Sequence, residues 1–371
     1  MAISLVLMSA YSMYATETRR QGCVNDSVPA LEGNWFRQLY ACDFKINDPR
    51  IKYPKFVAFC RQVYNWGDYT FNSYNPSYVT GTGRNWKLCI NNYNWIQNYA
   101  YLFHDSPVLL HTKIYSNFGL TLNFMAVSIG YSWNMNRLFS KNTDYRKTVT
   151  FSFTCSLFSS ELLYRKSIGK IHLTKFGNYK DEYGNSPHFI LNGTNDETLS
   201  INAYYFFNNR KYSQAAAYSY SKYQQKSAGS WILGLSYSRQ KISMDFSELP
   251  ESIRQEIPEF GDNYGFRYSD YAIMGGYGYN CVLPHKWLYN ITILPSVGYK
   301  RSSLIDRDNG IDHSAENNVC VNFCSKMSLT YNYRALFIST LLRFDGGVYL
   351  DNDYTFFNSM ASASVVAGVR F

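Results

Sequence analysis

The sequence has no long apolar run, and it has few charged residues. The longest nearly unbroken apolar stretch is AISLVLM at residues 2–8, whereas a membrane-spanning helix needs about 20 apolar residues. This excludes a helical membrane protein. Charged residues make up 17% of the chain, below the roughly 25% that is usual in soluble domains. Membrane β-strands remain open, because only alternate residues of such a strand face lipid and mean hydropathy stays low.

The sequence also lacks a compact cysteine framework. Its eight cysteines are scattered over the chain, unlike those of a small disulfide-stapled fold. Cys320 and Cys324 share one face of a strand pattern about 13 Å apart, which is too far for a disulfide or for one metal ion. We expect free thiols, with a Cys23–Cys42 or a Cys42–Cys60 bridge as the alternatives.

Aromatic residues are abundant. The chain has 35 tyrosines and 25 phenylalanines, and aromatic residues make up 18% of it. Tyrosine is favoured at membrane interfaces because its ring is apolar and its hydroxyl is hydrated. The net charge of +9 fits nucleic acid or anionic lipid, but no basic helical face or nucleic-acid motif accompanies it, so we expect no nucleic-acid partner.

The N-terminal region differs from the rest. Residues 1–15 have an apolar centre and end in Ala15 before TETRR, which predicts a signal peptide with a truncated start; an ordinary apolar segment is the alternative. Residues 16–80 form a predicted N-terminal periplasmic segment with a short helix near 55–64. The remainder, 81–371, is predicted as one barrel domain.

Strand patterns dominate after residue 80. In KTVTFSFTCSLF, residues 147–158, Val149, Phe151 and Phe153 share one face and serine and threonine occupy the other. A soluble sandwich would show the same period of two, so this stretch alone does not decide. The predicted strands lie roughly at 86–102, 108–118, 121–134, 145–157, 158–174, 197–209, 229–243, 270–283, 286–301, 316–331, 334–350 and 362–371.

The turns between these strands decide the fold class. Tight connections (NFGL, LFSS, LPHK and NYRA) alternate with long polar ones, which is typical of outer-membrane barrels. We therefore predict an all-β fold: an antiparallel transmembrane β-barrel of about 12 strands with a short N-terminal periplasmic lead, located in the bacterial outer membrane. The last strand ends in Phe371, which resembles the signal that the barrel-assembly machinery reads, so this machinery is an expected partner.

The inward faces of the predicted strands carry charge. In the strands at 316–331 and 334–350, Lys326, Arg343 and Asp345 oppose the apolar faces. The predicted lumen-lining residues are Lys300, Lys326, Arg343, Asp345 and Arg370, and a basic polar lumen would favour anions.

One predicted periplasmic connection is long where short turns are expected. It reads NRKYSQAAAYSYSKYQQKSAGS. Two functional interpretations are an inward plug and a dock for a periplasmic protein; the structural alternative is a turn that packs its tyrosines on the rim and satisfies lumen charges. The predicted residues of this plug are Arg210, Lys211, Tyr212, Tyr220, Gln224, Lys226 and Ser227.

Catalytic and metal motifs are weak. His104 lies in FHDSP, but Asp-Ser-Pro is ordinary turn chemistry. The acidic stretch DRDNGID at 306–312 lacks the EF-hand spacing. We expect no catalytic residue, no metal and no cofactor.

Several long blocks resemble a known family. YYFFNNRKYSQAAAYSYSKYQQKSAGSWILGLSYS and YSDYAIMGGYGYNCVLPHKWLYNITILPSVGYK, with YNWGDYTFNSYNPSYVTGTGRNWK and FSSELLYRKSIG before them, resemble domain of unknown function family 4421 (DUF4421) of Bacteroidota. The resemblance covers residue 64 to the end. It implies an outer-membrane barrel and names no reaction.

Together these observations favour a non-enzymatic, porin-like pore or solute-binding barrel. An enzyme that modifies lipid or lipopolysaccharide and a structural docking component of an envelope complex are the alternatives. Outer-membrane lipid, lipopolysaccharide and a periplasmic protein are the expected partners.

Overall fold

The computed structural model describes most of the chain in two units. The described residues are 32–42, 46–71, 73–103, 107–134, 145–180, 183–186, 188–245, 247, 249–251, 263–304, 316–350 and 354–371. The predicted signal peptide, His104, Cys23 and the acidic stretch at 306–312 lie outside them. The units are Met1–Ser73 and Tyr74–Phe371. No helix among the described residues is long and apolar enough to cross a membrane.

The first unit contains two helices. Helix α2 (Trp35–Ala41) begins after Asn34, whose side chain accepts a hydrogen bond from the Arg37 backbone N–H at 3.0 Å. Helix α3 (Lys55–Phe71) includes the segment that was predicted to be helical and continues beyond it. Cys42 and Cys60 are both unpaired in the structure, so the Cys42–Cys60 alternative was wrong.

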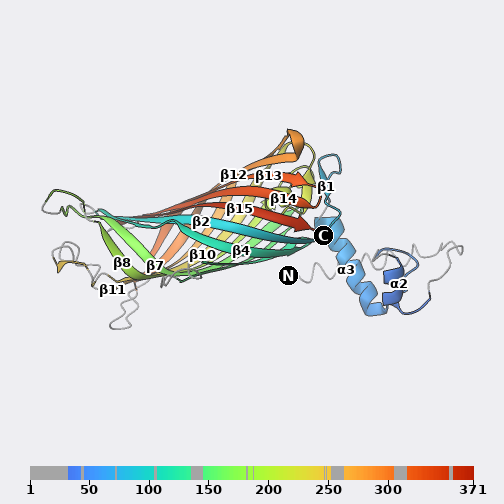
Figure 1. Ribbon diagram of the computed structural model, residues 1–371, viewed down its shortest axis with the longest axis horizontal. Helices are drawn as coiled ribbons and strands as arrows, with labels where there is room; N and C mark the ends of the chain where they lie inside the picture. The colour runs from blue at the N-terminus through green and yellow to red at the C-terminus, as the bar shows by residue number, and fades with distance from the viewer. Residues whose placement is uncertain are drawn as a thin grey trace. The chain divides into compact units, whose positions relative to one another are not determined.

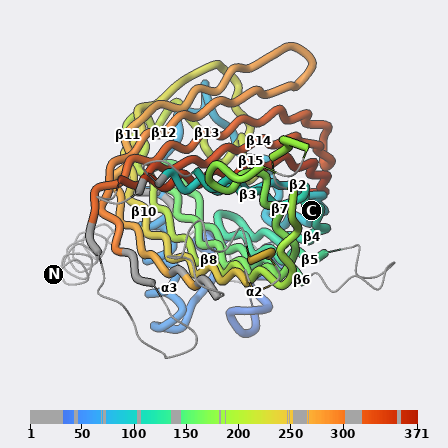
Figure 2. Tube along the Cα trace, turned by 90° about the vertical axis from the view of Figure 1, so that its left-hand side faces the viewer, coloured from blue at the N-terminus to red at the C-terminus, as the bar shows by residue number. Residues whose placement is uncertain are grey.

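The second unit contains a closed antiparallel sheet (Figure 1, Figure 2). β15 pairs with β2 and closes the ring. β3 and β4 both pair with β2 and are two parts of one bent strand, so the ring has twelve strands and the predicted fold class is confirmed. The strands are β2 (Trp86–Phe103), β3 (Pro107–Thr112), β4 (Tyr115–Phe124), β5 (Val127–Asn134), β6 (Tyr145–Thr154), β7 (Phe158–Phe176), β8 (Phe189–Phe206), β10 (Ala228–Asp245), β11 (Asn263–Leu283), β12 (Trp287–Leu304), β13 (Glu316–Tyr333), β14 (Leu336–Leu350) and β15 (Tyr354–Arg370).

One predicted turn was wrong. NFGL at 117–120 lies inside β4, and the turn comes at Met125, which has a φ of 50°. Gly119 is not a turn residue: a Cβ on it would overlap the side chain of Asn91 on the neighbouring strand. Glycine within a strand marks such a close approach as often as it marks a turn.

The circumference of the ring changes along its axis. β7 pairs with β6 from Ser159 to Ile168 but with β3 from Ile171 to Phe176. The short hairpin of β5 and β6 therefore occupies one part of the wall only, and removing these two from twelve leaves ten strands in the other part. We call the twelve-stranded end, with its short turns, the turn end, and the ten-stranded end the loop end.

Aromatic belts border the apolar outer face. Tyr237, Tyr271 and Tyr299 are directly opposite one another on β10, β11 and β12. Tyr289, at the other border, is ten residues before Tyr299 on β12, a span of about 25 Å for a strand rise of about 3.3 Å and a tilt of about 40°. Between the belts lie exposed side chains such as Leu235, which is 62% exposed. This arrangement is typical of a lipid-facing surface.

Substitution of Gly276 tests the tight contact between β11 and β12. A Cβ on Gly276 would overlap the carbonyl oxygen of Ile293, whereas a Cβ on Gly275 meets no described atom within 4 Å. We expect Gly276→Ala to lower the free energy of unfolding by about 1–3 kcal/mol, and Gly275→Ala to leave it within about 0.5 kcal/mol. Urea unfolding in detergent measures both variants. Equal effects of the two substitutions would contradict this packing.

Candidate functional site

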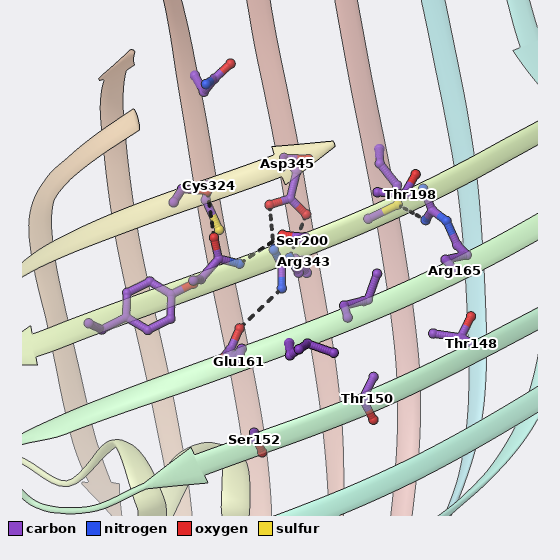
Figure 3. Close-up of a pocket in the computed structure, with 18 of the residues that line it drawn as sticks. Thr148, Thr150, Ser152, Glu161, Arg165, Thr198, Ser200, Cys324, Arg343 and Asp345 are labelled. Atoms are coloured by element: carbon purple, nitrogen blue, oxygen red, sulfur yellow. Dashed lines mark hydrogen bonds and ion pairs between the residues drawn. The ribbon is translucent and has the colours of Figure 1, made fainter. Parts of the chain in front are cut away.

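A polar chamber of about 450 Å³ lies inside the barrel (Figure 3). Hydroxyl groups from β6 and β8 cover much of its wall, and Thr148, Thr150 and Ser152 follow one another along β6. Phe151, between them in sequence, is 42% exposed on the outer face. The polar face of the 147–158 stretch therefore lines the lumen. The labelled lining residues are Thr148, Thr150, Ser152, Glu161, Arg165, Thr198, Ser200, Cys324, Arg343 and Asp345.

Four charged side chains meet at the chamber wall. The Lys326 ammonium lies 2.8 Å from the Glu161 carboxylate, which comes from the non-adjacent strand β7. Arg343, directly opposite Lys326 on β14, lies 3.7 Å from Glu161 and donates to Asp345 at 2.6 and 2.9 Å. Two adjacent cations would repel each other. The two carboxylates offset this repulsion and fix both cations.

A second polar layer lies toward the loop end. Lys300 lies 4.0 Å from Asp270 and 4.3 Å from the centre of the Tyr268 ring. Asp196 accepts hydrogen bonds from Tyr99 at 2.7 Å and from Gln240 at 2.5 Å. These groups come from several strands, and the bond between Tyr99 and Asp196 links β2 and β8, which are not adjacent in the ring.

The described inner face carries charges of both signs, and cations outnumber carboxylates on it. The structure places all five predicted residues, Lys300, Lys326, Arg343, Asp345 and Arg370, on the inner face. The other inward charges are the cations Lys87, Arg146 and Arg165 and the carboxylates Glu161, Asp196 and Asp270. The sequence analysis did not predict the carboxylates at Glu161, Asp196 and Asp270. The sequence analysis did not identify Glu161 as a lumen residue. Leu163 lies on the same face of the strand as Glu161, so the stretch FSSELL shows no uniformly polar face.

The long connection, residues 207–227, folds into the turn end; we call it the plug segment. It contains one π-helical turn, η1 (Ala215–Ser219), and the short strand β9 (Lys222–Gln224), which pairs with β1 (Val79–Gly81). Ala217 is fully buried. Small side chains allow this backbone to approach the barrel wall closely.

Side chains of the wall bind the plug segment. Arg370 donates from Nε to the Tyr220 carbonyl oxygen at 2.9 Å, and Lys87 donates to the Ser219 carbonyl oxygen at 2.6 Å. Both side chains thus donate hydrogen bonds to backbone carbonyl oxygens for which a short turn that is not α-helical provides no partner. Arg370 therefore lies at the plug segment, and the chamber is lined by other residues.

Buried amides and tyrosines complete the contact. Asn280 donates to the Ser213 carbonyl oxygen at 2.9 Å, and the Tyr218 hydroxyl donates to Asn290 at 2.5 Å. Burial raises the pKa of Tyr212 and Tyr218, so both remain protonated donors.

The predicted residues of the plug divide into two groups. Tyr212, Tyr220 and Gln224 are buried within the lumen, which matches the structural alternative of a turn that packs its tyrosines and satisfies lumen cations. The other four are exposed at the turn end: Arg210, Lys211, Lys226 and Ser227.

An apolar cluster occupies the interior at the loop end. Its members include Tyr101, Leu173, Ile242 and Phe356, all almost fully buried. The signal was present in the sequence: in KISMDF, Ile242 and Met244 interrupt the polar inward face of β10. The chamber lies between this cluster and the plug segment, and both contribute to closing the lumen.

Histidines gather on the outer face of the loop end. The rings of His111 and His172 stack with centroids 5.3 Å apart, and His188 lies 5.4 Å from His172. Within the described ranges, no group of three or more histidine, cysteine or acidic side chains is placed to hold a metal ion.

Comparison with known proteins gives a family. Residues 73–371 match the model of the family described as domain of unknown function (DUF4421). Similar solved structures include the Escherichia coli outer membrane protease OmpT (10% identity, TM-score 0.35, covering 79% of this chain and 98% of that one). Another is the translocator domain of the autotransporter NalP of Neisseria meningitidis (12%, 0.35, 78% and 89%). Ail of Yersinia pestis is a third (6%, 0.25, 76% and 98%). No curated protein matches in sequence.

Substitution of Glu161 tests the charge pairing in the chamber. Glu161→Gln leaves Lys326 buried without its carboxylate, so we expect a loss of about 3 kcal/mol in the free energy of unfolding, and partial recovery in Glu161→Gln/Lys326→Met. Urea unfolding in detergent measures the losses. Glu197→Gln, on the outer face, is the matched control. A Glu161→Gln variant as stable as the control would contradict the pairing.

Proposed function

The chain belongs to the DUF4421 family, and from this premise we propose that it is a non-enzymatic barrel of the bacterial outer membrane whose lumen binds a small polar solute. The membrane location is supported by the apolar outer face between the belts at Tyr289 and at Tyr237, Tyr271 and Tyr299. Exposed leucine, isoleucine and valine over such a band would be unfavourable in water, and they are favourable in lipid.

The chamber carries the solute-binding part of the proposal. Its volume of about 450 Å³ is within the range of small-molecule sites. Its wall combines hydroxyl and amide groups with charges of both signs, which Glu161, Arg343 and Asp345 present side by side. Such a wall can hydrogen-bond a hydroxylated or zwitterionic solute, because a cation and two carboxylates stand side by side at Arg343, Glu161 and Asp345.

The plug segment makes the resting barrel non-conducting in this proposal. Its backbone is held by Lys87 and Arg370, and its buried face by Asn280 and Asn290. Solute entry then requires the segment to move. We place the short-turn end in the periplasm, since long loops are extracellular in barrels of this kind.

Conductance of the purified, refolded chain in a planar bilayer tests this function. We expect the natural chain to show no steady current and Lys87→Ala/Arg370→Ala to show openings, because two of the bonds that hold the plug segment are lost. Lys286→Ala, at the same end but outside this contact, should stay silent. In the open variant, we expect small sugars or zwitterions to block the current at millimolar concentration.

Two results would overturn the proposal. A large steady current through the natural chain would contradict the closed lumen. An open variant that no sugar, amino acid or zwitterion blocks would contradict solute binding in the chamber. Loss of the heat-resistant, fast-migrating band on a gel identifies variants that did not fold.

A docking role is a second candidate, favoured by the charge of the turn end. The segments that form this end contain no aspartate or glutamate: residues 74–88, 123–128, 153–160, 205–230, 280–290 and 331–337. Six cations are exposed there: Arg84, Arg210, Lys211, Lys226, Lys286 and Arg334. Such a surface fits an acidic periplasmic protein.

Photo-crosslinking in intact cells tests the docking role. A crosslinking residue at Lys226 should give one discrete adduct with an acidic protein, and Arg210→Glu/Lys211→Glu should remove it, since like charges then face each other. The matched control places the crosslinking residue at Arg239, near the loop end. An adduct that survives the charge reversal would contradict this candidate.

A further inference from the structure

Cations follow the aromatic belt on the outer face near the loop end. On β10, Arg239 comes two residues beyond Tyr237, and on β12, Arg301 comes two residues beyond Tyr299. Side chains two residues apart share one face of a strand. Arg239 and Arg301 are therefore exposed on the outside of the barrel, just past the apolar band.

A second row of cations crosses neighbouring strands. Lys147 on β6 is directly opposite Lys166 on β7, and Lys241 on β10 is directly opposite Arg267 on β11. Glu197 on β8 stands between Lys166 and Lys241. We call the six basic residues the cationic belt: Lys147, Lys166, Arg239, Lys241, Arg267 and Arg301.

One carboxylate, Glu197, stands among the six cations of the belt in the described part of the chain. Within the described part of the chain, none of its six members makes an ion pair, and Glu197 accepts a hydrogen bond from Tyr164 at 3.0 Å. The buried Nε of Arg267 has no hydrogen-bond partner among the residues that the structure describes. Like charges directly opposite each other destabilise a sheet. An anion between them would remove this repulsion.

The cationic belt follows neighbouring strands of the ring. The belt covers the contiguous strands β6, β7, β8, β10, β11 and β12. On β13, Asn317 is directly opposite Arg301, so the row of cations does not continue onto this strand.

We propose that the cationic belt binds the phosphate groups of a phosphorylated glycolipid of the outer leaflet. This rests on the proposed outer-membrane location. The belt lies beside the aromatic residues, where lipid headgroups begin. Opposed side chains about 5 Å apart allow two cations to share one phosphate. Arginine adds paired donors that match phosphate oxygens.

Binding of diphosphoryl lipid A to the purified full chain in detergent tests the proposal, with native mass spectrometry as the readout. We expect Lys147→Gln/Lys166→Gln/Lys241→Gln/Arg267→Gln to weaken binding at least tenfold. The matched control removes four exposed cations at the turn end, Arg210→Gln/Lys211→Gln/Lys226→Gln/Lys286→Gln, and should bind as the natural chain does. Replacing the lysines by arginine should preserve binding.

Binding of other ligands distinguishes a phosphorylated glycolipid from other sources of phosphate. Equal binding of dephosphorylated lipid A would overturn the proposal in favour of apolar adsorption. Equal binding of phosphatidylglycerol, or competition by inorganic phosphate at the same concentration, would overturn the glycolipid in favour of general anion attraction. If the fourfold variant fails to fold, the exposed pair Arg239→Gln/Arg301→Gln should weaken binding at least threefold.

Cell fractionation distinguishes this proposal from the proposed function. A chain found outside the outer membrane would overturn the location on which both depend. A chain in the outer membrane that binds lipid A independently of the belt would overturn the cationic belt alone, and it would leave the solute chamber unaffected.

Discussion

Closure of the sheet is the constraint on which the rest of this structure depends. A strand next to lipid must pair its backbone N–H and C=O groups with other strands, because the surroundings offer no water. The pairing of β15 with β2 leaves the ring without an open edge. Once the ring is closed, alternate side chains face lipid and lumen, so the apolar outer face and the polar chamber follow from the same backbone geometry.

The charged side chains inside the barrel must then find partners of their own. Lys326 and Arg343 are neighbours on adjacent strands, and they are stabilised because Glu161 reaches them from across the lumen. Lys87 and Arg370 are satisfied by carbonyl oxygens of the plug segment. Buried cations and the inward fold of the plug segment thus stabilise each other. Hydrogen bonds and ion pairs order the polar part of the lumen, whereas apolar packing dominates at the loop end.

Much of the fold was predictable because strand alternation is local. The inward positions of Lys326, Arg343 and Asp345 follow from a period of two along each strand. Gly119 shows where this reasoning fails, since a glycine at a close approach between strands has the same sequence appearance as a glycine in a turn. The candidate site was predictable only in part, because Glu161 comes from a strand far away in the sequence from Lys326.

By itself, the sequence determined the fold class, the strand number and which face of most strands is apolar, because each depends on neighbouring residues. Only the tertiary structure decided that Glu161 pairs with Lys326 across the lumen, that Arg370 binds the plug segment, and that cations from β6 to β12 lie in adjacent rows. These depend on register and ring closure. A shift of one residue between two strands would leave every local pattern intact and change each of these contacts.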